Sequence, residues 1–127
     1  MRILVVDDEP NVRRLLSVQL GLAGHEVDIA EDGAAALVSL GQHRPDVLVL
    51  DVMMPHVDGW GVLAALRSKP QFVDLPVILL TAKDQAEDVA HSWDLGASMV
   101  MSKPYDGDRL IAVIEAFGLQ AEAVAQP

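Results

Sequence analysis

Short apolar runs recur along the chain and alternate with longer stretches in which apolar and polar positions mix. The runs are rich in valine, isoleucine and leucine, and their length is typical of strands that are buried on both faces of a parallel sheet. They are too short for helices of ordinary size, so the pattern predicts strands. The predicted strands are Ile3 to Val6, Val27 to Ala30, Val47 to Leu50, Val77 to Leu80 and Met99 to Met101.

The stretches between the strands carry the signals of amphipathic helices. Pro10 suits the first position of a helix that ends near Gly21 and Gly24. The apolar face of this helix would consist of Val12, Leu15, Leu16 and Leu20. Caps for the later helices are available at Asp32, at Asp58, at Asp84 with Glu87 in capping-box spacing, and at Asp106. Strands that alternate with helices in this way predict a doubly wound α/β domain, a parallel sheet with helices on both faces and right-handed crossovers.

Residues 1–118 are predicted to form one domain. A chain of 127 residues is long enough for a single hydrophobic core, and no internal repeat divides it. The last residues, up to Pro127, have little to bury. We therefore expect residues 119–127 to be a frayed C-terminal tail or the start of a linker.

Charge and cysteine content exclude several classes of protein. The chain has 19 acidic and 9 basic residues, a formal net charge of −10, whereas surfaces that bind nucleic acid depend on Lys and Arg. We expect no direct contact with nucleic acid. Cysteine is absent, which excludes disulfides and fits a reducing cytoplasm. No apolar run approaches the roughly 18 residues of a membrane span or forms a signal peptide, so a soluble cytoplasmic protein without a membrane partner is expected.

Reactive side chains follow four of the five predicted strands. Asp7 and Asp8 follow the first strand, Asp51 the third, Thr81 the fourth and Lys103 the fifth. In an open doubly wound sheet, ligands bind at the carboxyl ends of the strands, near the point where the strand order reverses. With the order 2-1-3-4-5 that point lies between the first and third strands. The three aspartates would then face one another across it.

Three carboxylates in one crevice repel each other unless a cation is present. Mg²⁺ prefers oxygen ligands and is commonly held by one or two carboxylates together with a phosphate of the substrate. Lys103 would add a positive charge beside such a phosphate, and Thr81 would add a hydroxyl. Because a carboxylate can itself accept a phosphoryl group and form an acyl phosphate, Asp51 is the central candidate for an acceptor.

The motifs VVDDEP, LDVMMPHVDG, LLTAK and MSKPY, in this order and spacing, resemble the receiver domains of bacterial two-component response regulators. The resemblance covers residues 1 to about 118, and the chain is similar to the chemotaxis response regulator. It implies a flavodoxin-like fold with five parallel strands in the order 2-1-3-4-5. It also implies a phosphorylation-controlled signalling switch rather than a metabolic enzyme. Such a switch catalyses only its own phosphorylation and hydrolysis.

Carried over by position, the resemblance gives each motif residue a role. Asp51 would accept a phosphoryl group from the phosphohistidine of a histidine kinase or a phosphotransfer protein. Asp7, Asp8, Asp51 and the backbone carbonyl of Met53 would hold Mg²⁺. A downstream effector would bind the fourth helix, fifth strand and fifth helix, and a phosphorylation-dependent homodimer is compatible with the resemblance.

The resemblance also implies how the phosphoryl group is held and lost. Thr81 and Lys103 would contact its oxygens, and the bond from Lys103 to Pro104 would be the cis peptide that is characteristic of the family. Met53, two residues after the acceptor, offers no hydrogen bond to a hydrolytic water. We therefore expect a long-lived phosphorylated form, in which Lys83, two residues after Thr81, has a lesser influence.

One position departs from the family pattern. Receivers usually carry Tyr or Phe three residues before the lysine, and this chain has Val100 there. Because valine is stiff and smaller than a ring, we expect the switch to act mainly through Thr81 and the following loop, toward the helix that carries Trp93. Tyr105 is the candidate substitute if that route is absent.

Two alternative functions share features with a phosphorylated receiver. One is a receiver that signals by protein contact without phosphorylation, for which Val100 is the only support. The other is a phosphohydrolase of the haloacid dehalogenase type, which also uses Asp, Thr and Lys on an α/β sheet. That family has Asp-x-Asp after its first strand, whereas Asp7 and Asp8 are adjacent and the expected nucleophile follows the third strand.

Overall fold

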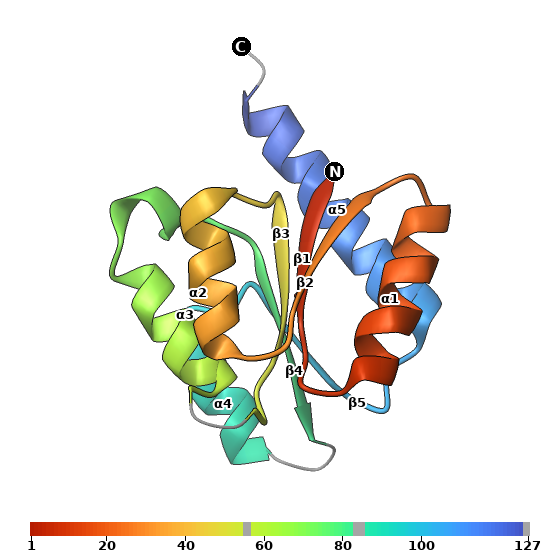
Figure 1. Cartoon of the computed structure of the whole chain (residues 1–127). Helices are drawn as coiled ribbons and strands as arrows, with labels where there is room; N and C mark the ends of the chain where they lie inside the picture. Colours follow the sequence, from red (N-terminus) through yellow and green to blue (C-terminus); the bar gives the residue numbers. More distant parts are fainter. Residues whose placement is uncertain (55–56, 83–85, 126–127) are drawn as a thin grey trace.

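The computed structural model describes residues 1–54, 57–82 and 86–125 and contains a single five-stranded sheet (Figure 1). All neighbouring strands pair in parallel, in the order β2-β1-β3-β4-β5. The strands are β1 (Arg2–Val6), β2 (Glu26–Ala30), β3 (Val47–Asp51), β4 (Val77–Ala82) and β5 (Met99–Lys103). This arrangement confirms the predicted flavodoxin-like, doubly wound fold.

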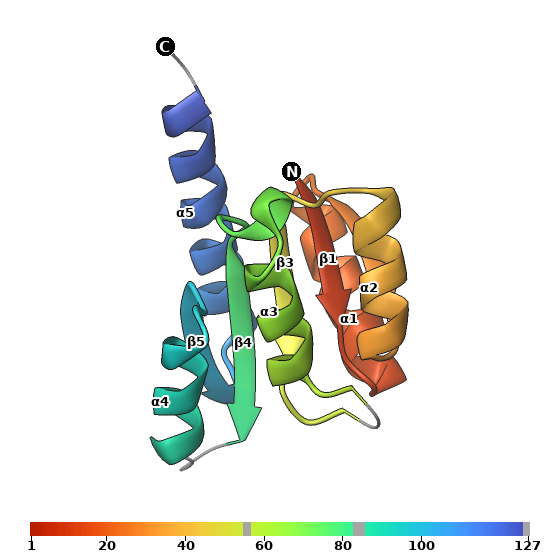
Figure 2. The same cartoon turned by 90° about the vertical axis from the view of Figure 1, so that its left-hand side faces the viewer.

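Helices cover both faces of the sheet, as Figures 1 and 2 show. The helices are α1 (Pro10–Leu22), α2 (Gly33–Gln42), α3 (Gly59–Arg67), α4 (Ala86–Asp94) and α5 (Gly107–Ala125), with a short 3-10 helix at Pro70–Phe72. On one face, Leu16 and Leu20 of α1 and Ile114 of α5 join the core. On the other face, buried residues of α2 and α3 do so, for example Leu40 and Leu63. The alternating faces of the strands supply the rest of both cores.

Helix starts follow the predicted caps. The side chain of Asp32 accepts a hydrogen bond from the backbone N–H of Ala35 at 2.8 Å, and Asp58 accepts one from Gly61 at 2.8 Å. Such bonds satisfy N–H groups that have no partner inside the helix. The predicted capping box at Asp84 lies outside the described residues.

The structure corrects the prediction for the apolar face of α1. Leu16 and Leu20 are buried as predicted, but Leu15 is 56% exposed. Adjacent helical residues point about 100° apart, and in α1 the residue that faces the sheet is Leu16. Leu15 lies instead on the surface beside the carboxyl ends of the strands, where it borders a cleft described below.

Helix α5 continues to Ala125, into residues 119–127, for which a frayed tail or the start of a linker stays the prediction. Figure 1 shows its end projecting past the sheet. Residues 119–125 read LQAEAVA, in which Ala, Leu, Gln and Glu are strong helix formers, and Gly118 alone does not end the helix. Among the described residues, no helix combines the length and hydropathy that crossing a membrane requires.

Candidate functional site

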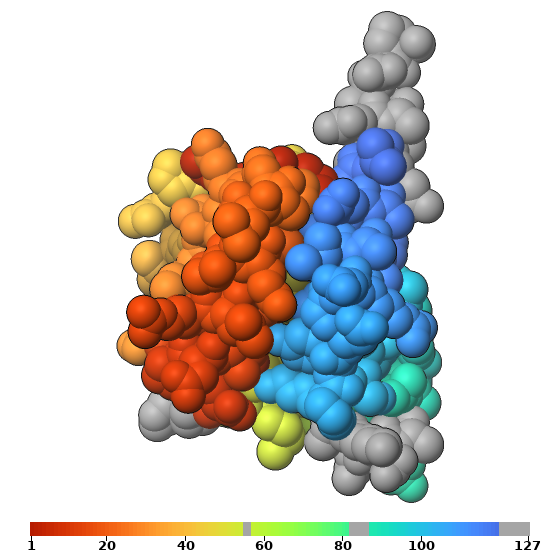
Figure 3. All heavy atoms as spheres, turned by 90° about the vertical axis from the view of Figure 1, so that its right-hand side faces the viewer, coloured from red at the N-terminus to blue at the C-terminus, as the bar shows by residue number. Residues whose placement is uncertain are grey.

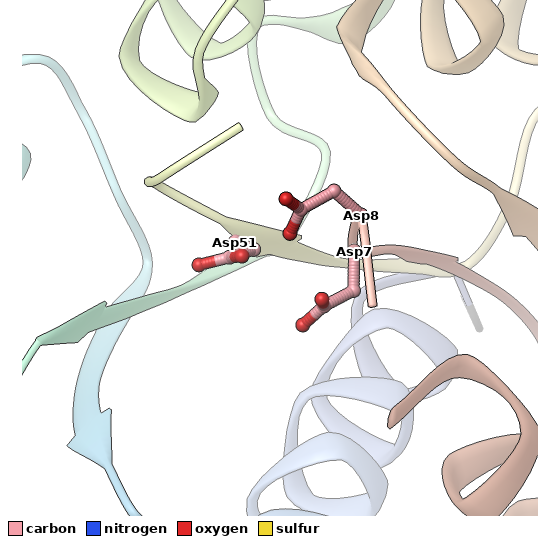
Figure 4. Close-up of side chains that lie close together, drawn as sticks. All are labelled: Asp7, Asp8 and Asp51. Atoms are coloured by element: carbon pink, nitrogen blue, oxygen red, sulfur yellow. The ribbon is translucent and has the colours of Figure 1, made fainter. Parts of the chain in front are cut away.

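Three carboxylates meet at the carboxyl ends of β1 and β3. These strands are neighbours in the sheet, with Val6 opposite Leu50, so the residues that follow them share one edge. Asp7, Asp8 and Asp51 each offer an oxygen within 4.8 Å of the others (Figure 4). Asp7 and Asp51 are buried, whereas Asp8 is exposed. The structure therefore brings together the three predicted metal-ligating acids, with solvent access from the side of Asp8.

Lys103 crosses to this cluster from the end of β5. Its Nζ lies 3.0 Å from Oδ2 of Asp7 and 3.3 Å from Oδ2 of Asp51. Burial would lower the pKa of the lysine, but the hydrogen bond to Asp7 and the charges of Asp51 and Asp7 outweigh burial and raise this pKa. The lysine thus stays charged, and it partly neutralises the two buried acids.

Asp51 is the acid whose ionisation is most perturbed. Burial raises the pKa of its carboxyl from 3.8 to about 6, and the charge of Asp7 adds to the rise, while Lys103 opposes it. The backbone N–H of Met53 donates a hydrogen bond to Oδ1 of Asp51 at 3.3 Å. At neutral pH the carboxyl is still mostly ionised and can act as a nucleophile.

Thr81 lies near the carboxyl end of β4, and its hydroxyl is buried. Among the described residues this hydroxyl has no hydrogen-bond partner. A buried hydroxyl without a hydrogen-bond partner lowers the stability of the fold. In a functional site, such a hydroxyl is available to form a hydrogen bond with a ligand oxygen. The donor set of Lys103 and Thr81, beside three carboxylates, fits a phosphoryl group together with a hard divalent cation.

A cleft of about 660 Å³ opens onto the acid cluster between α1 and the segment after β5. Asp51 and Lys103 line its inner end, and the rest of its lining includes Asp8, Leu15, Gln19, Met53 and Tyr105. Figure 3 shows α1 (red to orange) and α5 (blue) side by side on this face, with the segment after β3 (yellow-green) between them at the lower edge. A partner can therefore reach the acids from this face.

Other predicted residues lie near the cluster in different ways. Met53 is 66% exposed at the rim of the cleft, so its thioether faces solvent. The Lys103-Pro104 peptide is cis, as the resemblance implied. Val100 is half-buried in β5 and packs against the core on the face of α2 and α3. Lys83 lies outside the described residues.

Two further residues shape the site from outside the acid cluster. Arg13 of α1 donates a hydrogen bond to the backbone carbonyl of Asp7 at 2.7 Å, which fixes the loop after β1. Gly59 packs so closely on the backbone of Asp51 and Val52 that a β-carbon there would overlap them. Gly59 belongs to the motif LDVMMPHVDG, and a role in shaping the loop after Asp51 was expected for it, whereas no pattern in the sequence singles out Arg13 from the other basic residues.

Residues 3–115 match the family described as the response regulator receiver domain. The chain belongs to this family. The response regulator MprA of Mycobacterium avium is 44% identical over 116 residues, which are 91% of this chain and 50% of that protein. The DNA-binding dual master transcriptional regulator RpaA of Synechocystis is 36% identical over 125 residues, 98% of this chain and 52% of that protein. The receiver thus spans about half the length of these relatives.

Solved receivers share the whole architecture. The receiver domain of the Francisella response regulator 1452 is 30% identical and superimposes with a TM-score of 0.88, covering 94% of this chain and 98% of that one. Membership of the family does not favour the haloacid dehalogenase alternative or the phosphorylation-independent one. The expectation of no contact with nucleic acid concerns this receiver alone, since the name of RpaA describes the whole relative as DNA-binding.

Proposed function

We propose that this receiver is a phosphorylation-controlled signalling switch in which Asp51 accepts a phosphoryl group from a phosphohistidine. The observation that supports it most is the convergence of Lys103 and two further acids on Asp51 at the inner end of an open cleft. Neither a structural ion pair nor a solubilising acidic surface needs this combination. The donor would be a histidine kinase or a phosphotransfer protein, met in the cytoplasm.

In the transfer step, a carboxylate oxygen of Asp51 attacks the phosphorus atom of the phosphohistidine. The P–O bond forms as the P–N bond breaks, and the departing imidazole nitrogen takes a proton from water. Lys103 would hold an oxygen of the phosphoryl group, and the buried Thr81 hydroxyl would donate to another. Because the attacking oxygen must be ionised, the raised pKa of Asp51 predicts slower phosphorylation below about pH 6.

Asp7, Asp8, Asp51 and the backbone carbonyl of Met53 would hold Mg²⁺. The three carboxylates suit a divalent cation, because one oxygen of each lies within 4.8 Å of the others. Among the described residues, only Lys103 offsets their negative charge. When bound, the cation would neutralise the negative charge that gathers between acceptor and phosphoryl group. The fold itself already holds the carboxylate oxygens close together without a cation.

Loss of the phosphoryl group would be slow hydrolysis catalysed by the receiver itself. A water must stand in line with the acyl phosphate, and a neighbouring side chain can orient it only by a hydrogen bond. Met53 is exposed at the rim of the cleft and has only a weak acceptor in its thioether. We therefore propose a long-lived phosphorylated state.

The kinase or phosphotransfer protein would dock along α1. Leu15, Val18 and Leu22 are exposed apolar side chains of this helix, and Leu15 also lines the cleft. Apolar residues at this spacing form a stripe that suits a helical partner. The effector would bind α4, β5 and α5, and the same surface would serve a phosphorylation-dependent homodimer.

Intact-mass measurement after incubation with acetyl phosphate and Mg²⁺ tests the proposal. The wild type should gain one phosphoryl group and Asp51→Asn none. Asp74→Asn is the matched control, because Asp74 is an exposed aspartate near the opposite ends of the strands and should leave labelling unchanged. Full labelling of Asp51→Asn, or no labelling of the wild type by acetyl phosphate or a kinase, would contradict the proposal.

A further inference from the structure

Helix α4 is anchored to the body of the receiver by a polar side chain. Among its described side chains, those of residues 87–94, Ser92 is the one that is fully buried. The large apolar residue of this helix, Trp93, is 46% exposed. A helix that buries so little apolar surface is held weakly, and such elements are the ones that shift most readily.

The anchor of α4 is a hydrogen bond to the neighbouring helix α3. Nε1 of Trp60 donates to Oγ of Ser92 at 2.9 Å, and Oγ of Ser92 donates to the backbone carbonyl of Asp88 at 2.7 Å. The Ser92 hydroxyl thus donates a hydrogen bond within α4 and accepts one from α3. The ring of Trp60 also meets the ring of His91 edge-on, with centroids 4.8 Å apart. Trp60 is therefore the side chain that links the two helices.

Trp60 is joined directly to the acceptor strand. The preceding residue, Gly59, donates its backbone N–H to the carbonyl of Val52 at 3.0 Å. Gly59 also leaves no room for a β-carbon against the backbone of Asp51. The start of α3 consequently cannot move relative to Asp51 without breaking this packing, so a displacement of the acceptor segment carries Trp60 with it.

We propose that Trp60 is a positioning residue that transmits phosphorylation of Asp51 to α4 through its hydrogen bond to Ser92. This inference rests on the proposed function, because it takes Asp51 as the acceptor. It supplies a connection to α4 that does not use the aromatic switch position, where this chain has Val100. A phosphoryl group on Asp51 adds charge beside Met53 and displaces the backbone of Val52, against which Gly59 packs, and α4 follows through Trp60 and Ser92.

The test compares amide and indole NMR shifts with and without Mg²⁺ and beryllofluoride, an acyl-phosphate mimic. Trp60→Phe removes the indole donor but keeps a ring beside His91, and Ser92→Ala removes the acceptor. Trp93→Phe is the control, because Trp93 is exposed on the same helix. The chain has two tryptophans, so this control also assigns the indole N–H signal of Trp60.

The expected result has three parts. The indole signal of Trp60 shifts when beryllofluoride binds, the shifts of α4 amides fall by at least half in Trp60→Phe and Ser92→Ala, and they persist in Trp93→Phe. Amides at Asp51 and Met53 should respond in all variants, which shows that the mimic still binds. Undiminished α4 shifts in both linkage variants would overturn the inference and favour the route through Thr81. No response at Asp51 in the wild type would overturn the proposed function itself, and this inference with it.

Discussion

Replacing Asp51 with asparagine should stabilise the metal-free fold at neutral pH. The side chain of Asp51 is only 5% exposed and lies beside Asp7, so its ionisation is opposed by burial and by a like charge. Asparagine has nearly the same shape and no charge. Lys103 keeps Asp7 as its partner in the variant, at 3.0 Å in the native structure, so no new unpaired charge is created.

The size of this effect follows from the pKa of Asp51. A rise from 3.8 in the unfolded chain to about 6 in the fold corresponds to about 3 kcal/mol of destabilisation when the carboxyl is ionised. Solvent in the adjoining cleft screens the carboxyl, so we expect about 1 to 2 kcal/mol. The folded-state pKa is raised, so the cost is absent below about pH 4, grows as pH rises, and is complete above about pH 6.

Urea unfolding followed by circular dichroism, in buffers with a chelator, measures this difference at each pH. Asp51→Asn and wild type should be equally stable at about pH 4 and diverge as pH approaches neutrality. Asp94→Asn, which removes an exposed aspartate of α4, is the control for the loss of one negative charge at the surface. A gap between Asp51→Asn and wild type that does not change with pH, or an asparagine variant that is less stable at neutral pH, would refute the reasoning.

Three further outcomes can be checked separately. Asp8→Ala should weaken Mg²⁺ binding at least about tenfold, or about 1.4 kcal/mol, in a titration of amide shifts, whereas Asp74→Ala should not; equal affinities would contradict the metal site. Met53→Asn should shorten the lifetime of the acyl phosphate followed by mass measurement, since an amide can orient water; an unchanged or slower decay would show that this position does not control hydrolysis. Gly59→Ala should lower the free energy of unfolding by about 1 to 3 kcal/mol, whereas Gly41→Ala, where a β-carbon meets nothing, should not; a neutral Gly59→Ala would contradict the close packing described here.

The sheet and the acid cluster were predictable from sequence for one physical reason. Strands buried on both faces must be continuously apolar, and every residue of β3 is indeed buried. Parallel strands also end at one edge of the sheet, so a reactive residue after each strand must lie near the others. Asp7, Asp51 and Lys103 meet in this way although they are far apart in the chain.

Other features were not predictable, because they depend on how helices pack. Periodicity alone does not decide whether Leu15 or Leu16 faces the sheet, and Leu15 turned out to border the cleft. The bond between Trp60 and Ser92 joins two helices whose contact has no sequence signature, since a serine in a helix is usually exposed. The pKa of Asp51 likewise depends on the depth of its burial, which the residue type does not reveal.

The contrast between Asp51 on a rigid strand and the weakly held helix α4 would explain how the proposed phosphorylation of Asp51 changes the surface of the receiver. Asp51 ends a fully buried central strand, so phosphorylation there cannot be absorbed by a shift of the sheet without disturbing both cores. The displacement must pass to the segment that leads into α3, which touches the acceptor backbone at Gly59. Helix α4, held inward at Ser92, opposes such a displacement least among its neighbours. If Trp60 transmits this displacement as proposed, a receiver with Val100 in place of a ring would still present two different surfaces at α4.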